Sequence, residues 1–213
     1  MRCILMSSAL TLAVFFVMSN VQADDGPPGH SHEQEHQHQH AQNARPFGGG
    51  ESNYDFFLRK SDEAFHDGDY PRAIACHRAI IALEPDVVES YGVAAWLLWS
   101  SEKGDEATAI VEQGVAANPN NWEMMDEAAQ HFDLRKMTKR AASLYKRALE
   151  LIPRDEPSQM LRRRYAHAAE KSRDLQTSVM VWRTLAKEFP DEAVNKNNLA
   201  RVEQLWAKSL STP

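Results

Sequence analysis

Four prolines recur along most of the chain at a nearly constant spacing, and this period limits the possible folds more than any other feature. Pro85, Pro119 and Pro153 lie 34 residues apart, and Pro190 comes three residues later than that spacing requires. The extra residues are assigned to 156–158, which separate two helical patterns. Proline ends a helix because it lacks an amide donor and restricts the residue before it. The period therefore predicts similar helical units that stack on one another.

Polar residues at the expected helix starts support this division. Asp or Asn follows three of the four prolines, at Asp86, Asn120 and Asp191. Such side chains accept hydrogen bonds from the first free amides of a helix, so each is expected to cap the next helix. Ser158 and Asp174 are expected to cap two helices of the last unit in the same way.

Each unit also carries small and large apolar residues in a fixed order. The third unit has the fullest pattern: Met125, Ala128, Ala129, Phe132, Ala141, Tyr145, Ala148 and Pro153. The pattern resembles that of the tetratricopeptide-repeat (TPR) family over about residues 54 to 190. The resemblance implies an all-α fold, a right-handed helical-hairpin solenoid of four repeats with a C-terminal capping helix. The TPR domain is expected over 51–213, with repeats at about 54–87, 88–121, 122–155 and 159–192 and the capping helix at 193–210.

Small residues recur at two sites of the units, where two helices are expected to approach closely. The members of these sets are Ala95, Ala129 and Ala166 at one site, and Ala73, Ala107 and Ala141 at the other. Larger residues should then fill the space between one unit and the next. We expect all six alanines to be buried.

The first 23 residues have the pattern of a signal peptide. Arg2 is followed by a mostly apolar run, Ile4 to Met18, which is short for a bilayer span. Val21 and Ala23 place small residues where a signal peptidase cleaves. We expect export to the periplasm or secretion, with no stable membrane insertion after cleavage. The alternative is an uncleaved N-terminal anchor.

Residues 24–50 form a polar leader that ends in three glycines and contains no Ile, Leu, Val or Met. It has too little apolar surface to offset the entropy of folding, so disorder is expected. Imidazole is a common metal ligand, and the leader could bind Zn²⁺, Cu²⁺ or Ni²⁺ weakly; no other cofactor is expected. The alternative is a solvated linker. The candidate ligands are His30, His32, His36, His38 and His40.

Charge and cysteine content exclude some classes of protein. The formal net charge of −6 argues against non-specific nucleic-acid binding. Residues 51–134 hold 17 acidic and 5 basic side chains, whereas residues 135–173 hold 4 acidic and 12 basic ones. Such a gradient can steer a partner or can be a solvated dipolar surface. Removal of Cys3 with the signal peptide would leave Cys76 without an internal partner, and Cys76 is expected to be a buried core residue.

The resemblance to TPR proteins implies that the first helix of each unit lines a concave groove that binds a peptide or protein. Trp96 and Trp99 are the strongest anchors by residue type, although both could instead be core residues. A bound segment is expected to place basic residues towards Asp126 and Asp133, and acidic ones towards Arg163. The predicted contact residues are Phe65, Trp96, Trp99, Asp126, Gln130, Asp133, Arg163, His167, Lys171, Asn198 and Arg201.

No pattern of catalytic residues accompanies the repeats. The histidines of the repeat region, His66, His77, His131 and His167, are scattered over different expected helices. Scattered histidines are usually structural, so we expect no enzyme activity. The sequence favours an exported interaction module or adaptor. The alternative is a metal-handling protein that uses the His-rich leader, and the sequence predicts neither a named partner nor an oligomeric state.

The signal-peptide interpretation predicts that the mature chain begins at Asp24. Cleavage after Ala23 should remove the apolar run together with Cys3. Intact-mass measurement of the protein recovered after export checks this. A mass that still includes residues 1–23 would mean that the segment is an anchor.

Overall fold

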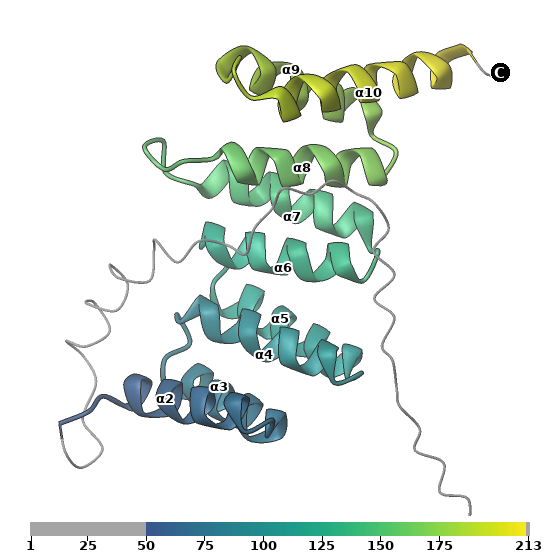
Figure 1. Ribbon diagram of the computed structural model, residues 1–213. Coiled ribbons are helices and arrows are strands. Elements are labelled where there is room, and N and C mark those ends of the chain that lie inside the picture. Colours follow the sequence, from purple (N-terminus) through teal and green to yellow (C-terminus); the bar gives the residue numbers. More distant parts are fainter. Residues whose placement is uncertain (1–49, 212–213) are drawn as a thin grey trace, which may run out of the picture. The chain divides into compact units, whose positions relative to one another are not determined.

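The structure, a computed structural model, describes residues 50–211. In that range the chain forms nine helices and no strand (Figure 1). They are α2 (Asn53–His66), α3 (Tyr70–Leu83), α4 (Val88–Ser100), α5 (Gly104–Ala117), α6 (Trp122–Leu134), α7 (Thr138–Leu151), α8 (Gln159–Lys171), α9 (Leu175–Glu188) and α10 (Ala193–Ser211). The predicted class, a helical-hairpin solenoid, is confirmed.

Helices that are neighbours in sequence are neighbours in space. Each helix from α2 to α9 packs against the next, and α4 also contacts α6. The hairpins α2–α3, α4–α5, α6–α7 and α8–α9 therefore stack in order, and α10 packs on α9 (Figure 1). We call α2, α4, α6 and α8 the first helices and their partners the second helices. In Figure 1, α2 and α4 lie in front of α3 and α5.

The alanines that were expected at the helix contacts are buried. Ala73, Ala107 and Ala141 on the second helices have no exposed surface, and neither do Ala129 and Ala166 on the first helices. Ala95 is exposed by only 2%. Small side chains at these positions allow the helix backbones to approach, and close packing stabilises the pair.

Gly114 on α5 shows how close this approach becomes. A Cβ atom at Gly114 would lie 2.6 Å from the sulfur of Met124 and 2.9 Å from the ring of Tyr91. Both neighbours are fully buried core side chains from α6 and α4. The first helices of two successive units therefore meet a second helix at a point where only glycine fits.

The apolar core is continuous along most of the stack. One cluster runs from Ala64 on α2 to Ala168 on α8, and a second gathers around Trp182 on α9. Val202 of α10 belongs to the second cluster and has no exposed surface. The last helix thus covers the end of the core, as a terminal cap must. Cys76 is buried, as expected.

Several of the expected helix caps were wrong. Asp174 does cap α9, accepting a hydrogen bond from the Thr177 amide at 3.1 Å. At α6 the cap is Asn121, which accepts from the Met124 amide at 3.0 Å, and not Asn120. Asn120 lies in the turn after the proline, because that turn takes one more residue before the helix starts.

The same one-residue delay affects other units. Val87, not Asp86, occupies the N-cap position of α4, and its side chain makes no cap bond. Asp191 lies two residues before α10 begins. Ser158 does occupy the N-cap position of α8, but its hydroxyl makes no cap hydrogen bond. Proline thus marks the end of a helix reliably, whereas the capping side chain depends on the geometry of the turn.

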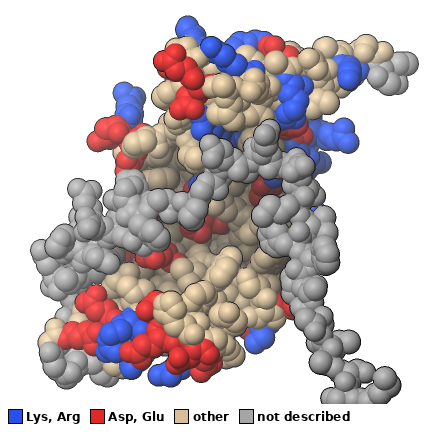
Figure 2. Space-filling model, viewed as in Figure 1, with Lys and Arg blue, Asp and Glu red and all other residues tan. Residues whose placement is uncertain are grey.

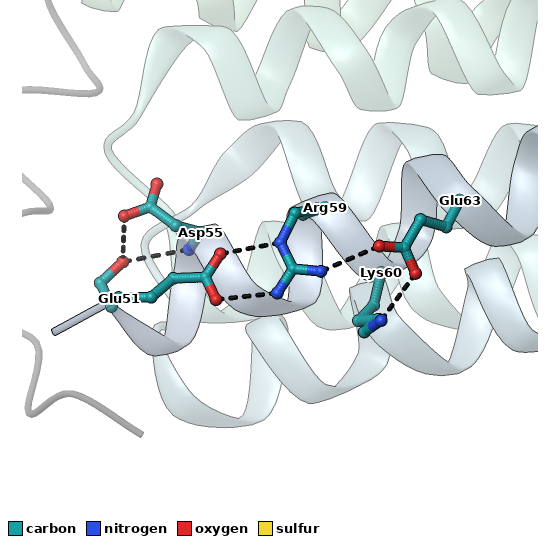
Figure 3. A network of polar contacts seen from close by, with 6 residues as sticks. Glu51, Asp55, Arg59, Lys60 and Glu63 are labelled. Carbon is teal, nitrogen blue, oxygen red and sulfur yellow. Dashed lines mark hydrogen bonds and ion pairs between the residues drawn. The ribbon is translucent and has the colours of Figure 1, made fainter. Parts of the chain in front are cut away.

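The exposed charges of α2 are paired within the first unit (Figure 3). Arg59 donates to both carboxylate oxygens of Glu51, at 3.0 and 2.9 Å, and to Glu63 at 2.9 Å. Lys60 also donates to Glu63, at 2.7 Å. At the start of α2, Ser52 accepts from the Asp55 amide at 3.0 Å and donates to its carboxylate at 2.6 Å. Exposed pairs of this kind contribute little to stability, because water screens the charges.

Two sequence predictions lie outside the described residues: the signal peptide over 1–23 and nearly all of the leader over 24–50. Within residues 50–211, no helix is both long enough and apolar enough to cross a bilayer.

The close contact at Ala129 predicts a low tolerance for larger side chains. Because Ala129 has no exposed surface, Ala129→Leu should force apart the helices around it and destabilise the protein by about 1–3 kcal/mol. Denaturant unfolding monitored by circular dichroism measures this. Ala200→Leu at the exposed face of α10 is the matched control and should leave stability nearly unchanged. If Ala129→Leu were as stable as Ala200→Leu and the wild type, Ala129 would make no close contact.

Candidate functional site

Four aromatic side chains lie exposed around the C-terminal ends of α2 and α4, and we call them the aromatic patch: Phe65, Tyr70, Trp96 and Trp99. The Phe65 ring lies 5.7 Å from that of Tyr70 and 6.2 Å from that of Trp96, measured between centroids. Trp96 is 51% exposed and Trp99 is 43% exposed. The patch therefore joins the first two units.

The two tryptophans are exposed because other residues fill the packing face of α4. Tyr91, Ala94 and Leu98 are fully buried or nearly so. Trp96 and Trp99 lie three residues apart and share the opposite, solvent-facing side. Of the two possibilities that the sequence left open, the structure supports exposed tryptophans over core ones. Their role in binding stays a prediction.

The predicted contact residues on α6 are held by bonds within the chain. Asp126 is only 8% exposed and accepts from Arg164 of α8 at 2.6 Å and from Gln130 at 3.2 Å. Its second carboxylate oxygen has no hydrogen-bond partner among the described residues. Burial raises the pKa of Asp126, while the Arg164 charge acts in the opposite direction. Asp133 pairs with Lys171 of α8 at 2.5 Å.

The predicted residues of α8 and α10 are also linked to one another. Arg163 donates to Asn195 at 2.9 Å, and Arg201 donates to Glu170 and to Asn198, the latter at 3.1 Å. The His167 ring packs edge-on against Trp182 at 5.0 Å. The predicted residues of α6, α8 and α10 are therefore engaged mainly by partners within the chain, and Asp133 and Lys171 are the predicted pair that meets across two of these helices.

Sequence reasoning missed Glu127 on α6. Its carboxylate lies against Gly92 of α4, so closely that a Cβ atom at position 92 would be 2.6 Å from one oxygen. Burial, reinforced by the adjacent Asp126 charge, raises the pKa of Glu127 to about 7. Gly92 is the sequence signal that could have indicated this contact. It lies on a first helix at a position where the other units carry larger side chains.

The charge gradient in the sequence is visible on the surface. Figure 2 shows the side of the first helices hollowed at its middle, with Asp and Glu in the hollow and around α2. Lys and Arg gather around α8, α9 and α10. The carboxylates on and beside α4 and α6 include Glu89, Glu123, Asp126 and Glu127.

Two histidines of the described region tie neighbouring helices together. His77 is buried and shares a hydrogen bond of 3.2 Å with Ser90, which ties α3 to α4. Burial lowers the pKa of His77 to about 4, so it is neutral at physiological pH. His131 bonds to Thr108 of α5 at 3.0 Å. Residues 50–211 contain no group of three or more His, Cys, Asp or Glu side chains that could hold a metal.

Two surface depressions lie away from the predicted contact residues. One, of about 440 Å³, is lined by residues 102–106 and Arg135. The other, of about 390 Å³, lies between α3 and α5. Arg135 donates to the Gly104 carbonyl, to Thr108 and to Asp105 at the first of these. Neither depression includes a residue of the aromatic patch.

Solved structures share this fold at low sequence identity. MamA aligns over 71% of this chain and 81% of its own, at 10% identity and a TM-score of 0.56. YrrB, described as a TPR protein with an unusual peptide-binding site, aligns over 71% and 76%, at 16% identity and a TM-score of 0.55. TTC0263, a TPR protein of Thermus thermophilus, aligns over 71% and 81%, at 15% identity and a TM-score of 0.51. These likenesses establish a TPR-type fold.

No protein-family model matches the chain, and no curated protein matches it significantly.

Proposed function

We propose that the chain is an exported interaction module that binds a peptide segment or partner protein on the face of its first helices. The observation that carries this proposal is the aromatic patch. Phe65, Tyr70 and Trp96 expose large rings side by side, and Trp99 is exposed three residues beyond Trp96 on the same helix. Clustered exposed aromatic side chains mark interaction sites, and Trp and Tyr are enriched among residues that dominate binding.

The charge arrangement favours a partner of mixed charge. Acidic side chains lie in the hollow on the side of the first helices and around α2, and basic side chains gather around α8, α9 and α10 (Figure 2). Because Asp126, Asp133 and Arg163 already have partners within the chain, a ligand would have to compete with those partners for direct contact. We therefore propose that these residues shape the surface, and that the aromatic patch supplies most of the affinity. The proposed role is binding, without catalysis.

Export is part of the same proposal. The signal-peptide pattern of residues 1–23 supports a location in the periplasm or outside the cell.

The binding proposal predicts that Trp96→Ala weakens a ligand by about 2 kcal/mol or more, which is roughly thirtyfold in Kd. Because Trp96 is half exposed, the same change should cost less than about 1 kcal/mol of folding stability. The ligands are peptides selected from a displayed library on the wild-type chain, and fluorescence anisotropy measures their affinity.

Met180→Ala is the matched control for this prediction. Met180 is an apolar side chain on the second helix α9 and is 59% exposed. It should leave affinity unchanged. Selected peptides that bind Trp96→Ala as tightly as the wild type would refute the proposed site. A large loss of stability in Trp96→Ala would mean instead that Trp96 is a core residue.

A second candidate function rests on the leader. Five histidines within residues 30–40 include three His-x-His pairs, at 30/32, 36/38 and 38/40, and support reversible binding of a divalent transition metal. We propose this as an accessory role of the same protein.

The metal proposal predicts that calorimetric titration with Zn²⁺, Cu²⁺ or Ni²⁺ at neutral pH gives saturable binding. Protonation should release the metal as the pH falls below about 6.5, since only neutral imidazole is a ligand. A variant with Gln at all five positions should lose the signal. Equal binding by the variant and the wild type would place the ligands elsewhere, and no binding by either would exclude the role.

A further inference from the structure

Glu127 of α6 is a partly buried acidic side chain whose carboxylate lies against Gly92 of α4. Within residues 50–211 it makes no hydrogen bond or ion pair, whereas its neighbour Asp126 is bonded to Arg164. The charged groups that face Glu127 are Glu89 from α4, Glu123 and Asp126 from α6, and Arg164 from α8. Tyr145 of α7 also lies near and is neutral, since burial raises its pKa. Three carboxylates therefore act on that of Glu127, and the cation that also acts on it, Arg164, is already bonded to Asp126.

Gly92 creates the space that this carboxyl group occupies. An added Cβ would meet the Glu127 oxygen at 2.6 Å and the carboxyl carbon at 3.1 Å. Any larger residue at position 92 would push the carboxyl group away from α4. The site therefore consists of the bare backbone of α4 at Gly92 and the carboxyl group of Glu127 from α6.

The carboxyl group adjoins the aromatic patch. Gly92 and Trp96 are four residues apart on α4, which places them on the same side of the helix about 6 Å apart along its axis. In an extended peptide, side chains two residues apart lie on the same side and are separated by about 6.5 Å. The distance between the two features therefore matches the spacing of alternate side chains in an extended ligand.

We propose that the aromatic patch and Glu127 form two adjoining subsites for one extended segment, in which an apolar or aromatic residue lies two positions from a lysine or arginine. Charge complementarity selects this occupant: the rings offer apolar contact, and the surrounding carboxylates disfavour an acidic side chain and favour a cation. The inference rests on the proposed function, because it specifies the ligand of the same surface.

The pH dependence of binding follows from the state of Glu127. In the free protein its pKa is about 7, and a cation in contact would lower that value in the complex. The free protein then binds more protons than the complex, so affinity must fall as the pH decreases below about 7. Between pH 8 and pH 6 the expected loss is up to about tenfold in Kd.

The test is a positional-scanning library of short extended peptides, applied to the full chain at pH 8 and pH 6. Enrichment of residue types at each position is measured for the wild type and for Glu127→Gln, Gly92→Ala and Trp96→Ala. Glu112→Gln is the matched control, because Glu112 lies on the second helix α5 and pairs with Arg140. Circular dichroism melting verifies that each variant is folded.

The wild type should select Lys or Arg two positions from an apolar or aromatic residue, more strongly at pH 8. Glu127→Gln should lose the basic preference and its pH dependence while it keeps the apolar one. Gly92→Ala retains every charge but displaces the carboxyl group, so it should weaken the basic preference. Trp96→Ala should lose the apolar preference.

Other outcomes separate the two proposals. Selection of apolar residues without Lys or Arg overturns the cation subsite and leaves the binding surface intact. A basic preference that persists unchanged in Glu127→Gln also overturns the subsite. No enrichment at any position in the wild type overturns both.

Discussion

The close contact of helices through alanine is the constraint on which the rest of the structure depends. Ala73, Ala107 and Ala141 have no exposed surface, and neither do Ala129 and Ala166. Because these contacts bring the backbones together, each unit has room for only a few large core residues, such as Tyr91, Phe132 and Trp182. Positions on the first helices that do not contribute to the core then face solvent. The exposed tryptophans of α4 are thus a consequence of how the core is filled.

Electrostatics divides the stack into two regions. On α6, α8 and α10, acidic and basic side chains from different helices neutralise one another, as in the pairs of Asp126 with Arg164 and of Asp133 with Lys171. Each of these bonds joins residues that are 38 positions apart in sequence. Near α4 the carboxylates outnumber the cations, and Glu127 is left with a raised pKa. The proposed ligand would supply the missing positive charge at that point.

The fold was predictable from sequence because the same pattern of prolines and small and large apolar residues recurs in each unit. The proline period and the recurring alanines gave the hairpins and the buried contacts, since one arrangement satisfies all units together. Capping was less predictable: Asn121 and not Asn120 caps α6, because the choice depends on the path of one turn.

The sequence identified Phe65, Trp96 and Trp99 as candidate groove residues but left open that the tryptophans are core, and it did not indicate the state of the acidic residues. Asp126 looked available to a ligand, yet Arg164 from the next unit occupies it. Glu127 was overlooked, because its burial and its contact with Gly92 depend on how α4 and α6 approach each other. Pairing between side chains on different helices is set by distances that the sequence pattern does not specify.

The central claim is that a ligand binds over Trp96 and Trp99, and fluorine NMR of 5-fluorotryptophan-labelled protein tests it most directly. The chain has five tryptophans, of which Trp182 is fully buried on α9 and Trp206 lies on α10. Substitution of single tryptophans by phenylalanine assigns the resonances. When a library-selected peptide saturates the protein, the resonances of Trp96 and Trp99 should shift, while those of Trp182 and Trp206 stay in place. A bound peptide that leaves the Trp96 and Trp99 resonances unchanged would contradict the account.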